Sequence, residues 1–244
     1  MSRNRVRTLE EALAMEARFK RVQERQLAEI AAAKQAKAVR KGPATGKAAS
    51  QSASGVGEVR IIGGQWRRTK LSVAQRPGLR PTPDRVRETL FNWLGQDLTG
   101  WRCLDAFAGT GVLGFEAASR GAQQVRVVEQ DAGLALQLER ICAQLGAQST
   151  LQVQRGDGIA ALHASAPGHW DVVFLDPPFD VESLFSPALQ AAVQVVADDG
   201  FIYLEAPQPW DETHLAPLGL KRHRYLKAGA VHAHLLQKIP RNAP

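Results

Sequence analysis

The chain has 244 residues, of which 44% are hydrophobic, and it carries a formal net charge of +7. It contains no apolar run of roughly 20 residues, no apolar stretch behind its polar N-terminus, and only two cysteines, Cys103 and Cys142. These features exclude a membrane protein, a secreted disulfide scaffold and a zinc ribbon, and they predict a cytoplasmic protein with one large domain, or with one domain and an appendage.

Positive charge is concentrated in the N-terminal two-fifths of the chain. Residues 1–57 carry a net charge of +7, residues 58–102 a net charge of +5, and residues 103–244 a net charge of −5. Such asymmetry is typical of a nucleic-acid-binding surface joined to a domain with another task. For residues 1–57 a solvated tail that aids solubility is an equal alternative.

The first 57 residues are expected to form an extension without a core. Residues 8–41 are rich in good helix formers and have only a partial apolar stripe, which indicates a long charged helix. Residues 42–57 contain mainly small residues and almost no large apolar side chain, which is typical of a flexible linker.

A small hairpin is expected near Glu58, at the start of the ordered part of the chain. Residues 59–62 have strand character, Gly63-Gly64 supplies a turn, and residues 65–71 form the returning strand. Cations on this strand and on the segment that follows form a candidate phosphate-binding rim, with ordinary solvated charge as the alternative. These cations are Arg67, Arg68, Lys70, Arg80, Arg85 and Arg87.

A helix is predicted that begins with Thr82 or Asp84 as its N-cap and extends to Leu94. After this helix, short strands alternate with helices. The predicted strands are 102–106, 124–129, 150–154, 170–175 and 200–205, and a closing pair at 220–227 and 231–239. The predicted helices between the first five strands are 112–120, 131–145, 158–164 and 183–197. This alternation predicts an α/β fold whose parallel sheet has helices on both faces.

A glycine-rich loop follows the first of these strands and opens the next helix. Gly109 and Gly111 allow a sharp turn close to a ligand, and Gly114 allows the helix to pack on the sheet. The pattern alone also fits nicotinamide dinucleotides. Asp105, just before the turn, would repel a pyrophosphate and favours a small cationic ligand, such as one with a sulfonium and an ammonium group.

Acidic residues end three successive strands, whose carboxyl ends meet at one edge of a parallel sheet. Glu129, about 20 residues after the loop, can accept two hydrogen bonds from a ribose diol. Asp157 can accept one from an adenine amino group, with Phe107 or Ile159 beside the ring, although a helix N-cap is its serious alternative. The candidate cofactor-binding residues are Thr82, Asp105, Phe107, Gly109, Thr110, Gly111, Glu129, Gln130, Asp157 and Gly158.

The fourth strand of this series ends in Asp176-Pro177-Pro178-Phe179. The two prolines stiffen the backbone and remove two N–H donors, which leaves carbonyl acceptors facing the expected ligand site at the carboxyl edge of the sheet. Asp176 and the Pro177 carbonyl can accept both N–H bonds of a planar amino group, and Phe179 offers a face for a flipped base. These four residues are the candidate catalytic residues; the alternative is a strand-ending turn with Phe179 in the core.

Together these motifs resemble an S-adenosylmethionine-dependent methyltransferase with a Rossmann-like fold, of the branch that methylates amino groups. Segments 60–67, 80–94 and 105–114 further resemble the bacterial small-subunit ribosomal RNA guanine-N2 methyltransferases (the RsmD type), over about residues 58–240. The resemblance implies a seven-stranded sheet whose last strand is antiparallel. It also implies S-adenosylmethionine as cofactor and one guanine of 16S ribosomal RNA, in the small ribosomal subunit, as substrate.

On this basis the chain is divided into a basic extension (1–57), a hairpin and helix that contact RNA and cofactor (58–98), and a methyltransferase domain (99–244). We expect a monomer. We also expect no metal, because His232 and His234 share one strand face but lack a third ligand and are best interpreted as a surface pair. Two alternatives stay open. One is a DNA adenine-N6 methyltransferase, and the other is a non-catalytic RNA-binding ribosome-assembly factor.

Overall fold

A computed structural model describes residues 56–74, 79 and 81–240. The predicted helix at 8–41, nearly all of the predicted linker and Arg80 lie outside the described residues. Within the described part of the chain, no helix has the length and apolar character needed to cross a membrane.

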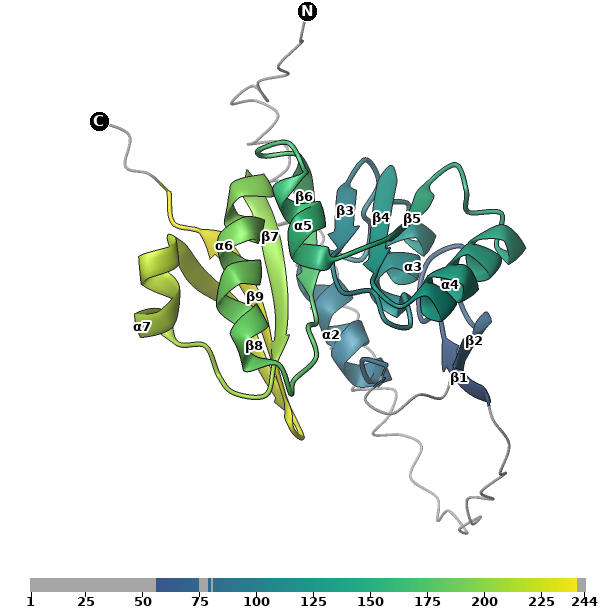
Figure 1. Cartoon of the computed structure of the whole chain (residues 1–244), viewed down its shortest axis with the longest axis horizontal. Coiled ribbons are helices and arrows are strands. Elements are labelled where there is room, and N and C mark those ends of the chain that lie inside the picture. The colour runs from purple at the N-terminus through teal and green to yellow at the C-terminus, as the bar shows by residue number, and fades with distance from the viewer. Residues whose placement is uncertain (1–55, 75–78, 80, 241–244) are drawn as a thin grey trace, which may run out of the picture. The chain divides into compact units, whose positions relative to one another are not determined.

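Seven strands form the central sheet. They are β3 (Arg102–Asp105), β4 (Gln124–Glu129), β5 (Leu151–Arg155), β6 (Trp170–Leu175), β7 (Val196–Ala206), β8 (Leu220–Ala228) and β9 (Val231–Lys238). Their order is β5-β4-β3-β6-β7-β9-β8, and β9 runs in the direction opposite to the other six strands (Figure 1). This confirms the predicted Rossmann-like fold. The strand order reverses between β3 and β6, which is where such sheets bind ligands.

Helices cover both faces of the sheet. One face carries α2 (Asp84–Leu94), α3 (Val112–Ser119) and α4 (Ala132–Gln144), and the other carries α5 (Gly158–His163) and α6 (Phe185–Val195). A short helix, α7 (Glu212–Leu215), precedes β8, and two 3₁₀ turns cover Glu182–Leu184 and Ala216–Leu218. Because β6 lies between the two layers, it is buried along its whole length, as its apolar run predicts.

The boundary between α6 and β7 differs from the prediction. The helix ends at Val195, and the strand begins at Val196 instead of Gly200. Val196 already has extended backbone angles and pairs with Trp170 across a register shift. The extra pairing explains why the strand starts earlier than its apolar run indicates.

The N-terminal hairpin is present, but its turn is not the predicted one. β1 (Val56–Arg60) pairs antiparallel with β2 (Lys70–Ala74), and residues 61–69 form the connecting loop. A Cβ atom on Gly64 would lie 1.8 Å from the Ser119 carbonyl oxygen, and the Ser119 hydroxyl donates to the Gly63 carbonyl at 2.6 Å. The two glycines therefore allow this loop to approach the end of α3 closely.

Candidate active site

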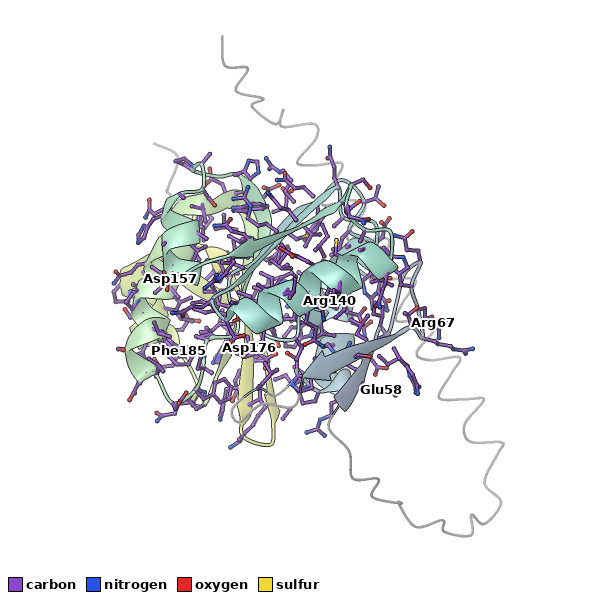
Figure 2. The ribbon with its side chains drawn as sticks, turned by 45° about the vertical axis from the view of Figure 1, so that its right-hand side comes forward. Glu58, Arg67, Arg140, Asp157, Asp176 and Phe185 are labelled. Carbon is purple, nitrogen blue, oxygen red and sulfur yellow. The ribbon has the colours of Figure 1, made fainter. Side chains whose placement is uncertain are left out.

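The carboxyl ends of four strands bring acidic side chains to the edge of the sheet at the switch point. They are Asp105 on β3, Glu129 on β4, Asp176 after β6 and Glu205 on β7. Asp105 is level with Phe174, and Leu175 is level with Leu204, so Asp176 and Glu205 follow in register on adjacent strands. Figure 2 shows Asp157 and Asp176 in one part of the molecule, with Arg67 apart from them on the side of β1 and β2.

The glycine-rich loop after β3 has the backbone geometry that the sequence indicated. Gly109 and Gly111 have φ angles of +52° and +72°, in the left-handed region that favours glycine. A Cβ atom on Gly114 would lie 2.3 Å from the Val127 side chain. Gly114 therefore lets α3 pack directly against β4.

Glu129 connects this loop to the end of β4. Its two carboxylate oxygens accept hydrogen bonds from the backbone N–H groups of Gly109 and Asp131, both at 2.8 Å. The side chain is partly exposed, and each oxygen has a second lone pair. Gln130 is exposed beside it. Glu129 is thus held in place and still able to accept hydrogen bonds from a ligand.

Asp157 is the N-cap of α5, as its alternative interpretation predicted. Its Oδ1 accepts a hydrogen bond from the Ala160 N–H at 2.7 Å, and the residue is exposed. Next to it, a Cβ atom on Gly158 would lie 2.1 Å from the Ala106 carbonyl oxygen and 3.2 Å from the Phe107 ring. Gly158 therefore allows α5 to begin directly beside Phe107, which is partly buried.

The Asp-Pro-Pro-Phe segment forms the turn after β6. Asp176 is partly exposed, Pro177 is buried and Pro178 is exposed. Phe179 is partly buried against the core cluster on the α5 and α6 side of the sheet, so part of its ring faces solvent and part belongs to the core.

Asp105, Asp176 and Glu205 make this edge strongly acidic and largely desolvated. Burial raises the pKa of Asp105 to about 7; the charges of Glu129 and Glu205 act in the same direction, and the hydrogen bond from the Gly114 N–H at 3.2 Å opposes them. Burial, with the charges of Glu205 and Asp105, holds the pKa of Asp176 well above its usual range. Among the described residues, none of these carboxylates forms an ion pair with a cation.

Glu205 is a member of the site that the sequence analysis missed. The Tyr203 hydroxyl donates to Glu205 Oε1 at 2.8 Å, and Thr82 also forms a side-chain hydrogen bond with Glu205. Burial raises the pKa of Glu205 despite these two bonds. Glu205 could have been found in the same way as Asp105 and Glu129, because it is an acidic residue at the end of a predicted strand, the fifth one. Thr82, expected near the cofactor, is buried at this same edge.

Arg87 does not belong to the predicted phosphate-binding rim. Its side chain is fully buried, and its guanidinium donates to Glu116 (2.8 Å), to Asp84 (2.6 Å) and to the Thr82 carbonyl (3.1 Å). It is a structural residue that connects α2 with α3. Other members of the rim are exposed, and Lys70 pairs with Glu58 at 2.7 Å. These exposed residues are Arg67, Arg68, Lys70 and Arg85.

His232 and His234 are buried, so the expectation of a surface pair is wrong. The His234 ring accepts a hydrogen bond from the Trp210 N–H at 3.0 Å, and the His232 ring contacts the Tyr225 hydroxyl at 2.7 Å. In the described residues no group of three or more His, Cys, Asp or Glu is arranged to hold a metal ion.

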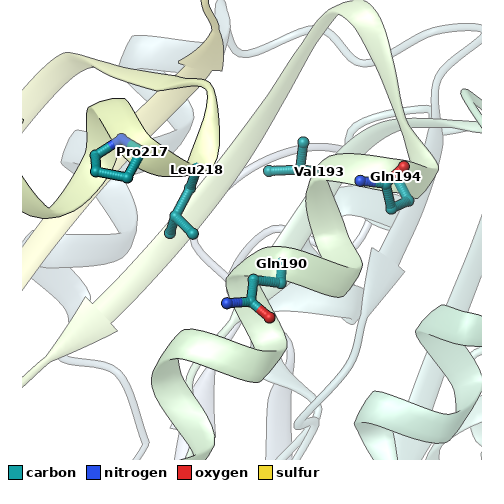
Figure 3. Close-up of a pocket in the computed structure, with 5 residues that line it drawn as sticks. All are labelled: Gln190, Val193, Gln194, Pro217 and Leu218. Atoms are coloured by element: carbon teal, nitrogen blue, oxygen red, sulfur yellow. The ribbon is translucent and has the colours of Figure 1, made fainter.

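A separate pocket of about 270 Å³ lies between α6 and the second 3₁₀ turn (Figure 3). Its lining residues are Gln190, Val193, Gln194, Pro217 and Leu218. The Gln194 carbonyl accepts a hydrogen bond from the N–H of Gly168, shortly before β6 begins. The pocket therefore lies toward the amino ends of the strands and is not part of the acidic site.

Comparison with known proteins identifies the family. The model described as "Conserved hypothetical protein 95" matches residues 59–237. The chain is also 39% identical over 191 residues to Ribosomal RNA small subunit methyltransferase D of Escherichia coli (strain K12), an alignment that covers 76% of this chain and 92% of that one. The chain belongs to this family. The family resemblance found in the sequence is thereby confirmed.

Other members of the family support the same conclusion. Ribosomal RNA small subunit methyltransferase D of Haemophilus influenzae is 48% identical over 131 residues, which is 53% of this chain and 68% of that one. A solved structure of a putative methyltransferase from Escherichia coli superposes with a TM-score of 0.64 at 40% identity, and covers 75% of this chain and 98% of that one. The family model begins at residue 59, so the whole basic extension (1–57) lies outside it. The chain is an enzyme of the methyltransferase class.

Proposed function

We propose that this chain transfers a methyl group from S-adenosylmethionine to the N2 amino group of one guanine in 16S ribosomal RNA. The small ribosomal subunit is its partner, and the enzyme acts as a monomer in the cytoplasm. The observation that carries the proposal is the acidic edge formed by Asp105, Asp176 and Glu205 beside the Asp-Pro-Pro-Phe turn. The relatives named for ribosomal RNA favour this substrate over DNA adenine.

The residues at the edge fit S-adenosylmethionine. Glu129 holds carboxylate oxygens at the end of β4, where a ribose diol can donate to them. Phe107 and Asp157 lie beside the start of α5 and suit the adenine. These carboxylates pair with no cation among the described residues, and they favour a ligand with sulfonium and ammonium charges. When bound, this cofactor supplies an electrophilic methyl group.

Asp176 and the Pro177 carbonyl orient the guanine amino group. N2 is a poor nucleophile because its lone pair is delocalised into the ring. Hydrogen bonds from both N–H groups to these two acceptors raise its electron density and aim the lone pair at the methyl group. Such orientation contributes several kcal/mol of barrier lowering. Phe179 stacks on the flipped base.

Asp176 also accepts the proton that leaves N2 after transfer. Its pKa is held well above the usual range by burial and by the neighbouring carboxylates Glu205 and Asp105, so its carboxylate is a better proton acceptor than an exposed one. Tyr203 and Thr82 fix Glu205 by hydrogen bonds, which keeps this environment constant.

The exposed cations of the N-terminal hairpin and α2 bind phosphate groups around the target. Arg67 and Arg68 extend from the loop that is docked on α3, and Arg85 from the first turn of α2. Arg87 holds the backbone of this region in place from the core, because its guanidinium donates to the Arg60 carbonyl and to Glu116. The three exposed side chains therefore project from a well-fixed backbone.

The test is transfer of labelled methyl groups from S-adenosylmethionine to small subunits from cells that lack this enzyme. Nuclease digestion of the labelled RNA should yield N2-methylguanosine at one position. Label in adenosine, or no label in the RNA although the cofactor binds, would overturn the proposal. DNA and free 16S RNA serve as parallel substrates.

A further inference from the structure

Tyr225 is an exposed aromatic ring on the edge strand β8, with 39% of the residue accessible to solvent. Among the described strands, β8 pairs with β9 only, so it is the edge strand of the sheet. Cations flank the ring: Arg222 and Lys227 are exposed, and the guanidinium of Arg222 lies 5.3 Å from the ring centroid. Basic side chains around an aromatic ring are the composition that single-stranded nucleic acids bind.

The ring is fixed by the two histidines that the sequence analysis interpreted as a surface pair. The Tyr225 hydroxyl contacts His232 Nδ1 at 2.7 Å, and the rings of Tyr225 and His234 lie 5.2 Å apart. His234 is itself held by the Trp210 N–H at 3.0 Å. Burial lowers the pKa of His234 to about 4, which keeps it neutral at physiological pH. A ring fixed in this way loses little conformational entropy when a base stacks on it.

The register of the sheet places Tyr225 level with the carboxyl end of β6, where the acidic edge lies. Tyr225 is level with His234, His234 with Leu204, and Leu204 with Leu175, the residue before Asp176. Three strand spacings separate β8 from β6, which is roughly 14 Å. The end of the β8–β9 hairpin projects from this edge in Figure 1 and lies below the Asp176 label in Figure 2. A short single-stranded segment can span that distance.

We propose that Tyr225 and Arg222 form a stacking platform for an unpaired nucleotide near the target guanine, and that Lys227 binds its phosphate. The inference rests on the proposed function, since it names how the RNA substrate is held at the same site. RNA recognition commonly uses unstacked bases on aromatic rings or guanidinium planes, and the exposed charged residues of β8 itself are all basic. The platform explains why buried histidines support an exposed tyrosine.

The first experiment measures steady-state methyl transfer to unmodified small subunits. Tyr225→Leu should raise KM for subunits by about 5- to 150-fold, the range expected when one stacked base is lost, with kcat within about twofold of wild type. Tyr225→Trp should restore most of the affinity. Lys227→Gln should raise KM by a smaller factor. Lys221→Gln is the matched control, because Lys221 is exposed on the same strand but level with Gln237, toward the opposite end.

A second experiment uses a short single-stranded RNA labelled for fluorescence anisotropy. Tyr225→Leu should weaken its binding and Lys221→Gln should not. Unchanged KM in both Tyr225→Leu and Lys227→Gln would overturn the platform. A raised KM on subunits with unchanged binding of the oligonucleotide would also overturn it, and would assign the surface to a ribosomal protein. If the wild type does not methylate subunits, the proposed function fails, and the oligonucleotide still reports on Tyr225.

Discussion

Among the described residues, two clusters of largely buried charged side chains differ in their partners: one contains opposite charges, and the other contains carboxylates only. Beside α3, Glu116 is bound by Arg87 at 2.8 Å and by Arg120 at 3.3 Å. At the carboxyl edge of the sheet, burial raises the pKa of Asp105, Asp176 and Glu205, and the charge of Glu205 raises the pKa of the other two further. None of the three forms an ion pair with a cation of the described residues.

This difference distinguishes a cluster that stabilises the fold from one that belongs to the active site. Burying a charge is costly unless an opposite charge and hydrogen bonds accompany it, and the cluster around Glu116 meets that condition. Glu116 also accepts hydrogen bonds from the N–H groups of Ile62 and Gly63, so it holds the N-terminal loop on α3. Within the part of the chain that the structure describes, the acidic edge does not meet the condition. We infer that a cationic ligand completes it.

The largest effect is expected at the acidic edge. Asp176→Ala should lower kcat by about 1000-fold, because an acceptor for the reacting amino group is removed, while cofactor binding persists. Asp176→Asn keeps one acceptor oxygen and should retain part of the activity. Single-turnover methyl transfer measures both. Asp180→Ala, an exposed acid four residues later, is the control. Near wild-type turnover in Asp176→Ala would remove this residue from the mechanism.

Substitutions in the cluster around Glu116 should lower the stability of the fold. Arg87→Gln leaves Glu116 short of a partner in the core, and the free energy of unfolding should fall by about 3–5 kcal/mol. Arg85→Gln, two residues earlier on the exposed face of α2, should change it by less than about 0.5 kcal/mol and weaken RNA binding instead. Urea denaturation and RNA titration measure the two effects. Equal stability of both variants would contradict the assignment of Arg87 as scaffold.

Glu129 lies between the two cases, since backbone groups rather than cations bind it. Glu129→Ala should weaken binding of the cofactor product by about 1–3 kcal/mol, through loss of charge-assisted hydrogen bonds to the ribose. Calorimetry measures the change, and Glu139→Ala on the exposed side of α4 is the control. An unchanged affinity would place the ribose site elsewhere.

The smallest effect on turnover is expected from the basic extension. Residues 1–54 carry a net charge of +7, and β1 begins at Val56, so a protein that starts at Gly55 keeps the hairpin. Its removal should flatten the plot of log affinity against log salt by about 0.7 per lost phosphate contact on single strands, with saturating turnover unchanged. Equal slopes for the two proteins would leave the extension as a solvated tail, and lost turnover would place it in the site.

The strands and strand ends were predictable because their signals are local. Asp105 and Glu129 follow valine- or leucine-containing runs, and the sheet topology brings these ends together. Glu205 had the same local signal but no motif around it. Its partners Tyr203 and Thr82 become recognisable only when the chain segments before α2 and along β7 meet.

Arg87 was wrongly assigned to the phosphate-binding rim because it lies among other cations in the sequence. The spacing of the apolar residues around it indicates the correct, buried position. Arg87 precedes Leu90, Phe91 and Leu94 at spacings of three, four and seven residues, so it lies on the apolar face of α2. Glu116, the one charged residue in the otherwise small and apolar α3, is its natural partner. The support of Tyr225 by His232 and His234 was not predictable, because it depends on a register that a bulge shifts between Arg222 and Arg224.

Proton exchange during cofactor binding tests most directly whether the acidic edge awaits a cation. The pKa of Asp105 is raised from 3.8 to about 7 in the free protein, so this carboxyl is largely protonated below that pH, and a bound cation favours its carboxylate. Calorimetry near pH 6.5, in buffers of different ionisation enthalpy, should show proton release with S-adenosylmethionine and less with S-adenosylhomocysteine, which lacks the sulfonium charge. The affinity for S-adenosylmethionine should rise with pH and level off above about 7. Equal proton exchange for the two ligands, with an affinity that does not change with pH, would contradict the account.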